Sequence, residues 1–413
     1  MVSTRLNDEV VSPKILKSKI AWRDFLPALI LVSNALVWYT LTYQAYSSVV
    51  GGLPTGSESL LLFLVYYMGI AFSAIFGAVL FRRFRDNGLL LWMLGGAAMT
   101  ALLATVPNNT MAINLLVSVL LGVSIGIGLP SCLAYFADAT RVENRGICGG
   151  IIWGTVGFGV LLLGLLLNAF NLVLAFVALA VWRMFGLFGF LFTRSKRRSQ
   201  VARISPAYRS ILRRRDMILY LVPWIMFSLV NFTETPILEN LLGSIYVTTI
   251  FIEGALTGIF AIVGGFLADL VGRKRVVITG FVVLGIGYAV LSLSPDLAAS
   301  WYLYTAFDGI AWGMFAAVFF MTLWGDLGED YEKAKYYAIG GLPYLLASVL
   351  PIIIKPYLPL NATGAAFSLA SFFLFVAVLP LIYAPETLPE KEIRDRERRD
   401  YLEKAKKVKE KYA

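Results

Sequence analysis

The stretch that decides the fold reads Gly265-Phe266-Leu267-Ala268-Asp269-Leu270-Val271-Gly272-Arg273-Lys274-Arg275. It joins two apolar runs, 246–270 and 275–293, and each is long enough to cross the hydrocarbon layer of a membrane. Asp269 ends the first run, where a carboxylate can pair with a cation or with the N-terminus of a neighbouring helix. Gly272 allows a tight turn, and the three cations after it favour an anionic membrane surface. The stretch therefore predicts a short, charged connection between two membrane-spanning helices.

The rest of the chain has the same apolar character. Of its 413 residues, 58% are hydrophobic and only 15% are charged, whereas a soluble domain has roughly 25% charged residues. This composition excludes a soluble globular protein. Apolar runs of about 20 residues without strand alternation predict helices, because a helix satisfies its own backbone in lipid. Twelve such runs occur, at 25–50, 59–81, 88–107, 111–136, 147–169, 172–192, 217–241, 246–270, 275–293, 300–324, 335–355 and 362–384.

Positive charges are distributed on one side of these runs. All but two of the 36 Lys and Arg residues lie before the first run, after the last, or in loops that fall on the same side when the spans alternate. The exceptions are Lys355 on the other side and Arg183 inside a span. The positive-inside rule then predicts a multi-pass protein of the cytoplasmic membrane with both termini in the cytoplasm. The net charge of +10 marks one face of a bilayer, so we expect no nucleic-acid partner.

The basic loop 193–216 divides the chain into two halves of six runs each. We expect an N-terminal cytoplasmic segment (1–24), a six-helix bundle (25–192), a basic linker (193–216), a second six-helix bundle (217–384) and a charged tail (385–413). The halves read as a duplication, because residues of the same kind recur at a constant offset of 188. These pairs are Gly77 and Gly265, Arg85 and Arg273, Asp138 and Asp326, and Arg145 and Lys333.

Three motifs resemble the major facilitator superfamily. The stretch 265–275 is similar to its loop signature G-x-x-A-D-x-x-G-R-K/R, and Asp138 with Arg145-Gly146 resembles its acid, six residues, Arg-Gly pattern. Pro385-Glu386-Thr387 resembles the sugar-porter ending. With twelve spans and a basic central loop, the resemblance covers nearly the whole chain. It implies an all-α membrane fold of two pseudo-symmetric six-helix bundles with 12 transmembrane helices, which transports by alternating access.

These motifs supply a candidate cytoplasmic gate, because ion pairs can hold one side of a transporter shut in one state and break in the other. The first-half copy of the loop departs from the pattern, since Phe81 stands at the position that corresponds to Asp269, and Phe84 stands at the position that corresponds to Gly272. A symmetrical charge relay is therefore not expected, and the sugar-porter assignment is a subgroup hypothesis. The candidate gate residues are Gly265, Asp269, Gly272, Arg273, Asp138, Arg145, Asp326 and Lys333.

Three carboxylates lie inside spans of the second half, roughly 10 to 12 Å from the ends opposite the basic loops at 1.5 Å per residue. Because burial disfavours a charged carboxylate, such a group can take up and release a proton during a transport cycle. A structural polar pair is the alternative. The chain has no histidine, so we expect any coupled proton to use Asp308, Glu234 or Glu253. Glu239 is nearer the surface and should be solvated.

Aromatic, amide and carboxylate side chains share helical faces in the first, seventh and tenth spans. Such faces suit hydroxyl-rich rings through stacking and hydrogen bonds, and organic cations through cation–π contacts. Packing is the alternative for each residue. The candidate substrate-binding residues are Asn34, Trp38, Gln44, Asn231, Glu234, Tyr304, Asp308 and Trp312.

Arg183 is the only cation deep in a span, and a structural partner or snorkelling is favoured over a substrate role. The first, fourth, seventh and tenth spans hold no Lys or Arg, which argues against an anionic substrate in the cavity between the halves.

The sequence thus predicts a monomeric secondary transporter of a small polar solute, sugar-like and neutral or cationic, coupled to protons and without metal or cofactor. Efflux of organic cations by proton antiport is the first alternative. A membrane-embedded enzyme is less favoured, because the sequence has no histidine-based site and no Gly-x-x-x-x-Gly-Lys-Ser/Thr phosphate loop. A transport-fold sensor is also less favoured, because we expect no long cytosolic domain.

Overall fold

The computed structural model describes residues 20–51, 56–82, 84–105, 110–194, 206–243, 246–328, 332–357 and 363–389. No strand occurs in these ranges. Three short helical segments of other types are η1 (Val142–Asn144), η3 (Ala316–Thr322) and η4 (Lys355–Tyr357). The α-helices are α1 (Trp22–Gly51), α2 (Gly56–Leu80), α3 (Arg85–Leu103), α4 (Met111–Gly126), α5 (Leu129–Ala139), α6 (Arg145–Asn168), α7 (Leu172–Thr193), α8 (Tyr208–Leu212), α9 (Arg215–Leu242), α10 (Tyr246–Val271), α11 (Arg273–Leu293), α12 (Ala298–Phe315), α13 (Leu323–Leu327), α14 (Lys333–Ala347), α15 (Leu350–Ile354), α16 (Thr363–Val376) and α17 (Val378–Tyr383).

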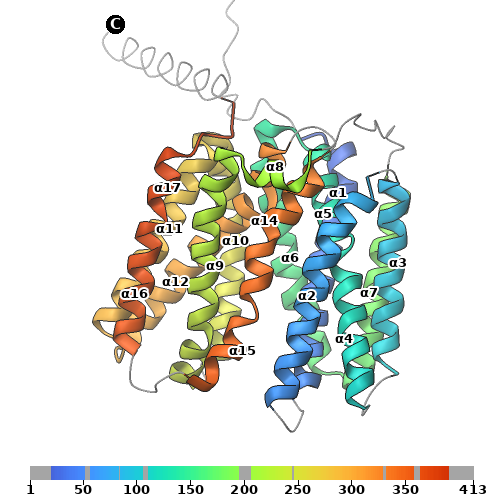
Figure 1. The fold of residues 1–413 in the computed structure, drawn as a ribbon, viewed down its shortest axis with the longest axis horizontal. Coiled ribbons are helices and arrows are strands. Elements are labelled where there is room, and N and C mark those ends of the chain that lie inside the picture. The colour runs from blue at the N-terminus through green and yellow to red at the C-terminus, as the bar shows by residue number, and fades with distance from the viewer. Residues whose placement is uncertain are drawn as a thin grey trace, which may run out of the picture.

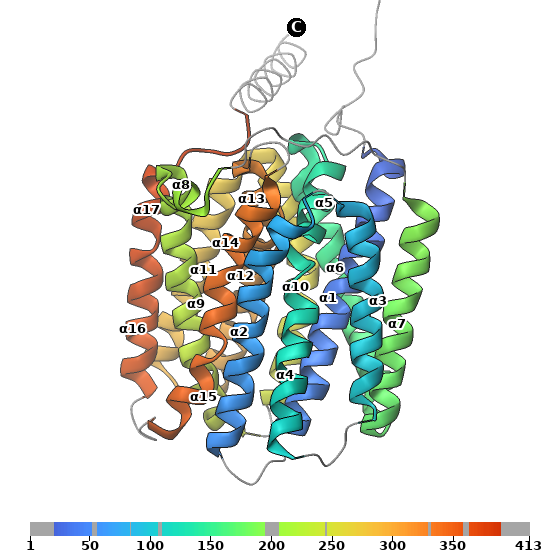
Figure 2. The same cartoon turned by 45° about the vertical axis from the view of Figure 1, so that its right-hand side comes forward.

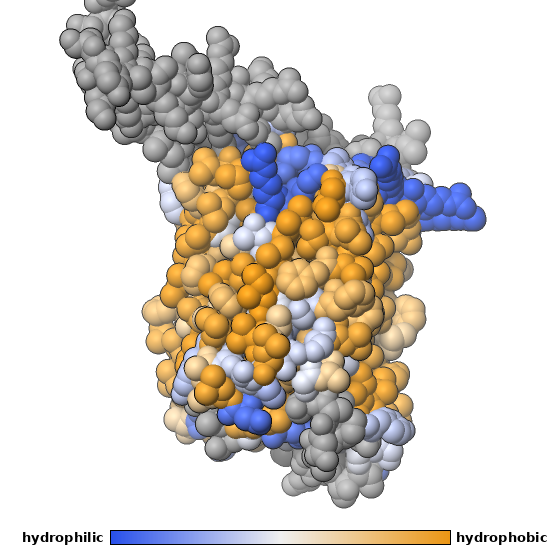
Figure 3. Space-filling view, turned by 90° about the vertical axis from the view of Figure 1, so that its left-hand side faces the viewer, coloured by the Kyte–Doolittle hydropathy of each residue, from blue (hydrophilic) through white to orange (hydrophobic). Residues whose placement is uncertain are grey.

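Twelve helical stretches of the described residues are long and apolar enough to cross a membrane, which confirms the predicted number of spans. Several spans contain a break. The fourth consists of α4 and α5, and Pro130 at the start of α5 cannot donate the backbone hydrogen bond that would continue α4. The tenth consists of α12, the π-helical segment η3 and α13. On the face over the second bundle, apolar residues cover the middle and hydrophilic residues gather at the two ends (Figure 3).

The spans form two bundles, as Figures 1 and 2 show: α1 to α7 make up the first, and α9 to α17 make up the second. The bundles meet along two seams, where α6 packs against α10 and η3, and where α2 and α5 pack against α14. The expected all-α membrane fold of two six-helix bundles is confirmed. The predicted segments 1–24 and 385–413 lie largely outside the described residues, and so do residues 195–205 of the predicted linker 193–216.

Glycines allow the close helix contacts, and they act in two different places. Gly122 and Gly126 of α4 lie against α2 inside the first bundle, where an added Cβ would stand 2.3 Å from the Tyr66 carbonyl oxygen and 2.2 Å from the Ile70 carbonyl oxygen. Gly150 of α6 lies against α10 at the seam between the bundles, where an added Cβ would stand 2.3 Å from the Ala261 carbonyl oxygen. Packing accounts for the first pair, whereas the seam glycine lies where the two bundles meet.

Gly265→Ala is expected to weaken this seam. A Cβ at Gly265 of α10 would lie 2.2 Å from the carbonyl oxygen of Gly146 on α6, so one helix must move. We expect a loss of about 1–3 kcal/mol in the free energy of unfolding, measured by denaturation in detergent. Gly254→Ala on the same helix is the matched control, because no atom lies within 4 Å of its added Cβ. An equal loss in both variants would contradict the seam contact.

Candidate functional site

Two of the three deep carboxylates are buried inside the second bundle. Glu234 on α9 is 3% exposed and Asp308 on α12 is 4% exposed, while Glu253 on α10 is half-buried. Neither carboxylate oxygen of Glu234 has a hydrogen-bond partner among the described residues, and nor does Oδ1 of Asp308. The ion pairs of the described ranges include none of the three. The predicted acids therefore form one cluster without a cationic partner in the described part of the chain.

The carboxyl groups of Glu253 and Asp308 lie close enough to share a hydrogen bond. An ionised carboxylate has only acceptor oxygens, so a hydrogen bond between two carboxyl groups requires one proton. The contact joins α10 to α12, and Gly309 allows the approach, because its added Cβ would lie 2.5 Å from Cβ of Leu256. The pair can therefore hold one proton between two helices of the second bundle.

Tyrosines surround this pair on the bundle side. The hydroxyl groups of Tyr304 on α12 and Tyr288 on α11 lie 2.8 Å apart and are hydrogen-bonded. Tyr304 is buried, one helical turn before Asp308. This hydrogen bond joins α12 to α11 and fixes the position of the Tyr304 ring next to the carboxyl pair.

Aromatic side chains line the divide between the bundles beside the acids. Trp153 on α6 contacts Phe320 of η3 across the divide, with ring centroids 5.4 Å apart. On the second bundle, Trp312 and Phe320 both pack edge-on against Tyr344 of α14, at 5.8 and 5.2 Å. Tyr344 lies close enough to Glu253 and to Tyr43 of α1 for electrostatic interaction. The half-buried rings therefore form an aromatic surface that reaches from one bundle to the other.

The predicted substrate residues fall into separate places. Trp312 is half-buried in this aromatic surface. Asn231 is half-buried on α9, and its backbone carbonyl oxygen accepts a hydrogen bond from the hydroxyl of Thr235, one turn later, at 3.0 Å. Gln44 on α1 is exposed. Tyr39 and Tyr43, which face Tyr344 from α1, were missed in the sequence. Their spacing of four residues on one helical face was the available signal.

A network of charges closes one end of the molecule, which we call the basic end. In the first half, Asp138 accepts from Nη1 of Arg85 at 2.5 Å and from Nζ of Lys333 at 2.7 Å. Lys333 belongs to α14, so this carboxylate connects the two bundles. The second half repeats the pattern: Asp326 pairs with Arg273 at 3.1 Å and with Arg145 of the first bundle.

Each aspartate thus binds the arginine 53 positions before it in its own half and a cation of the other half. The expectation that the charge relay is unsymmetrical is therefore wrong for Asp138 and Asp326. The reason is that the acid and basic positions kept their 188-residue offset although the loop itself changed. The relay differs between the halves at Asp269, whose first-half counterpart is Phe81.

Asp269 contacts the N-terminus of α6, as its place at the end of a span predicts. Its Oδ1 accepts from the backbone N–H of Gly146 at 2.9 Å and its Oδ2 from that of Ile147 at 2.7 Å. Arg273 pairs with it at 2.9 Å. The four N-terminal N–H groups of a helix lack intrahelical partners, so a carboxylate there satisfies two of them and favours the helix dipole. Asp269 thereby ties α10 of one bundle to α6 of the other.

The segment after the last span also joins the basic end. Glu386 accepts from the backbone N–H groups of Arg273 at 2.9 Å and Lys274 at 3.2 Å, at the start of α11. Gly272 has φ 105°, a conformation that disfavours other residues. A Cβ there would also stand 2.3 Å from a Glu386 carboxylate oxygen. The tight turn that the sequence predicts is present.

Solved transporters share this fold over most of the chain. The human organic anion transporter MFSD10 (TETRAN) has a TM-score of 0.64 at 16% identity, covering 87% of this chain and 99% of that one. The proton:xylose symporter XylE, bound to 6-bromo-6-deoxy-D-glucose, has a TM-score of 0.63 at 16% identity, covering 89% and 96%. Residues 236–410 match the family model described as Major Facilitator Superfamily. The matched segment makes up less than half of the chain.

The matched segment and the shared fold agree with the family resemblance in the sequence. No curated protein matches the chain by sequence. At 16% identity, the two solved structures show that the fold is shared.

Asn34 and Trp38 of α1 lie buried inside the first bundle. Asn34 donates to the Trp182 carbonyl oxygen at 2.7 Å and accepts from Nη1 of Arg183 at 2.9 Å. The Trp38 ring N–H donates to the hydroxyl of Thr100 at 2.8 Å. Both residues have structural partners in this conformation, and solute contact by either stays a prediction. Arg183 also has a structural partner, as the sequence favoured.

Proposed function

We propose that this transporter couples protons to the movement of a small polar solute, sugar-like and neutral or cationic, by alternating access. The observation that carries the coupling is the closeness of the Glu253 and Asp308 carboxyl groups, which can share a hydrogen bond only if one of them holds a proton. Two carboxyl groups within one hydrogen bond exchange that proton readily with water when the cavity opens. Glu234, buried nearby on α9, is a third acceptor.

The solute would lie between the bundles, against Trp312, Asn231 and the acids on one side and α1 on the other. The half-buried rings around Tyr344 support this placement, because aromatic faces beside carboxyl groups bind sugar rings by stacking and cations by cation–π contacts. Gln44 of α1 is exposed, so its amide is able to reach a polar solute.

Alternating access would break and remake the charge network of the basic end. The cross-bundle pairs Asp138 with Lys333 and Asp326 with Arg145 are made in this structure, and Asp269 joins α10 to the N-terminus of α6. We propose that this network, with Gly265, Gly272 and Arg273, is the cytoplasmic gate in its closed state. Rocking of bundle 25–192 against bundle 217–384 would open it.

The orientation in the membrane follows the charge distribution. We propose that the basic end faces the cytoplasm, that both termini lie there, and that a monomer in the cell membrane is the working unit. Lys355 and Glu239 pair at 3.0 Å at the opposite end, and both are exposed, as the sequence predicted for Glu239.

Efflux of organic cations by proton antiport is the second candidate. The aromatic surface beside the carboxyl pair favours it, because a desolvated cation over aromatic rings is stabilised by roughly 2 kcal/mol. The direction of proton movement separates the candidates. A symported solute brings protons into the liposome with it, whereas an antiported cation drives them out.

The test combines binding with flux. Sugars, amines and carboxylates are screened for thermal stabilisation of the purified protein, and those that bind are added to proteoliposomes that contain a trapped pH indicator. We expect a sugar or amine to move protons and to accumulate in response to a pH gradient. Counterflow of a labelled solute without proton movement would leave a uniporter, and accumulation of carboxylates alone would contradict the solute class.

A further inference from the structure

Arg183 is a buried cation that the transport mechanism does not use. Its side chain is 0% exposed on α7, inside the first bundle. The guanidinium lies between two indole rings, 4.5 Å from the centroid of Trp38 and 4.2 Å from that of Trp92. Among the described residues no carboxylate forms an ion pair with it. A full positive charge is thus held in the membrane part of the bundle without a counter-charge from the described ranges.

One edge of this guanidinium has no partner in the described part of the chain. Nη1 donates to the Asn34 side-chain oxygen at 2.9 Å, but Nε and Nη2 have no hydrogen-bond partner among the described residues. Nε and Nη2 form one side of the planar guanidinium, the fork that binds two oxygens of a carboxylate at once. Gly96 faces this side, and its added Cβ would lie 3.3 Å from Nε.

The surrounding side chains are fixed by other bonds. The ring N–H of Trp92 donates to the Ser124 carbonyl oxygen at 2.7 Å, and that of Trp38 donates to Thr100. Gly128 leaves room for the Trp92 ring, since a Cβ there would lie 2.1 Å from it. The two rings therefore hold the guanidinium in place and cannot supply the acceptors that its free edge lacks.

The duplicated half shows that the fold does not require a charge here. Ser371 stands 188 residues after Arg183, on α16, and its hydroxyl donates to the Gly285 carbonyl oxygen of α11 at 2.8 Å. This contact joins α16 to α11, the second-half counterparts of α7 and α3, and Gly285 stands 188 residues after Ala97, the neighbour of Gly96. A neutral side chain thus serves the equivalent packing in the second bundle.

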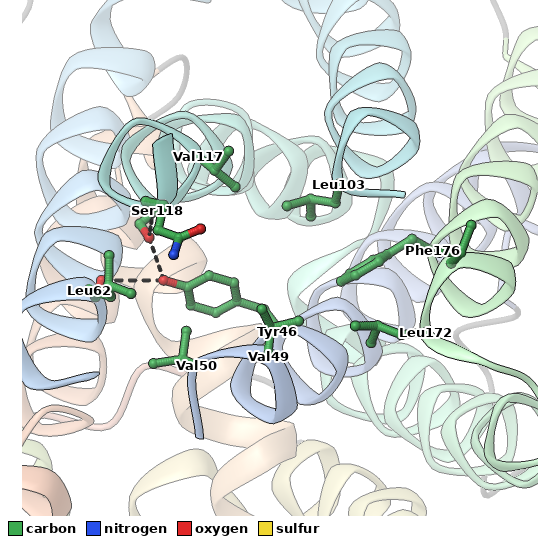
Figure 4. Close-up of a pocket in the computed structure, with 11 residues that line it drawn as sticks. Tyr46, Val49, Val50, Leu62, Leu103, Val117, Ser118, Leu172 and Phe176 are labelled. Carbon is green, nitrogen blue, oxygen red and sulfur yellow. Dashed lines mark hydrogen bonds between the residues drawn. The ribbon is translucent and has the colours of Figure 1, made fainter. Parts of the chain in front are cut away.

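The first bundle also contains a pocket, which Figure 4 shows with its lining side chains. Phe176, Leu103 and Tyr46 line it. They lie seven or eight residues from Arg183, Gly96 and Trp38 on the same three helices, or about 10–12 Å at 1.5 Å per residue. Its wall is mostly apolar, and the hydroxyl of Tyr46 is hydrogen-bonded to Ser118.

We propose that the Nε and Nη2 edge of Arg183 is a binding site for a monocarboxylate with an apolar substituent, which enters through this pocket. The carboxylate accepts from both nitrogens and supplies the missing negative charge, and the substituent lies toward the apolar wall. This site is inside the first bundle, apart from the cavity between the bundles.

The test measures the thermal unfolding of the purified protein with benzoate, at constant ionic strength and with chloride as the reference salt. Benzoate is expected to raise the unfolding temperature of the wild type in a saturable manner. Arg183→Lys keeps the charge but loses the fork, so we expect the apparent Kd for benzoate to rise by about tenfold or more. Arg141→Lys, at an exposed arginine, is the matched control and should leave the Kd unchanged.

Equal benzoate stabilisation of wild type and Arg183→Lys, or none beyond chloride in the wild type, would overturn the site. If Arg183→Lys does not fold, Leu103→Trp, which fills the pocket, takes its place and should weaken benzoate binding. Solute-driven proton movement is measured in a separate experiment. Its absence would therefore not contradict benzoate binding at Arg183, and the absence of benzoate binding would not contradict proton coupling.

Discussion

Replacing Asp308 by asparagine is expected to abolish solute-driven proton movement while labelled-solute exchange continues. The amide nitrogen of the new side chain would donate to Glu253, so the contact between α10 and α12 would persist without the shared proton. Asparagine has nearly the same shape as aspartate, so the fold should be retained. Proton movement is followed with the trapped pH indicator, and exchange by counterflow in the same liposomes.

The matched control for this experiment is Glu239→Gln. Glu239 is an exposed acid of the same bundle, paired with Lys355 and not part of the carboxyl cluster. It should keep both activities, because an exposed pair contributes at most about 1 kcal/mol to stability. Wild-type proton movement in Asp308→Asn would contradict the assignment of Asp308 to coupling.

Asp326→Asn is expected to destabilise the closed basic end by about 3–5 kcal/mol, because the buried Arg145 loses its anion. The side chain of Asp326 is buried and pairs with Arg145 and Arg273, which come from different bundles. Arg145 would lose its acidic partner, whereas Arg273 would keep its pair with Asp269. The molecule should therefore unfold at a lower temperature and spend more time with this end open.

A native cysteine reports the opening. Cys148 is buried on α6, one turn after Arg145 and close to Asp269. With Cys132 replaced by serine, the labelling of Cys148 by a thiol reagent should be faster in Asp326→Asn than in the parent. Asp216→Asn, which removes the anion of a partly exposed pair with Arg214, should leave the labelling rate unchanged. Equal rates in all three proteins would show that the network does not hold this end closed.

The helices and their number could be predicted from local sequence, because a membrane demands about 20 apolar residues per span. The 188-residue offset likewise predicted which charges correspond. The spacing of Asp138 and Arg85 could not show that Lys333, 195 positions away, is the second partner of Asp138. That contact depends on how the two bundles dock.

For the candidate site too, the sequence predicted which residues matter, and the packing of the helices decided which of them meet. The three deep acids stand out in the sequence because ionisable residues are rare in spans. Whether they meet depends on the rotation of α9, α10 and α12 about their axes, which the packing of glycines such as Gly309 fixes. From the sequence we expected Asn34 and Trp38 to face the cavity between the bundles. In the structure α1 packs against α7 so that both side chains lie inside the first bundle.

By itself, the sequence determined the class of protein, the spans, the side of the positive charges and the duplicated design, since each follows from hydropathy or spacing along one chain. Only the tertiary structure decided the partners: Asp308 with Glu253, Asp326 with cations of both bundles, and Arg183 between two indoles with one edge free of partners in the described ranges. The physical reason is that apolar helices in lipid are held by close packing and directional hydrogen bonds, and these depend on the helix face that each neighbour covers.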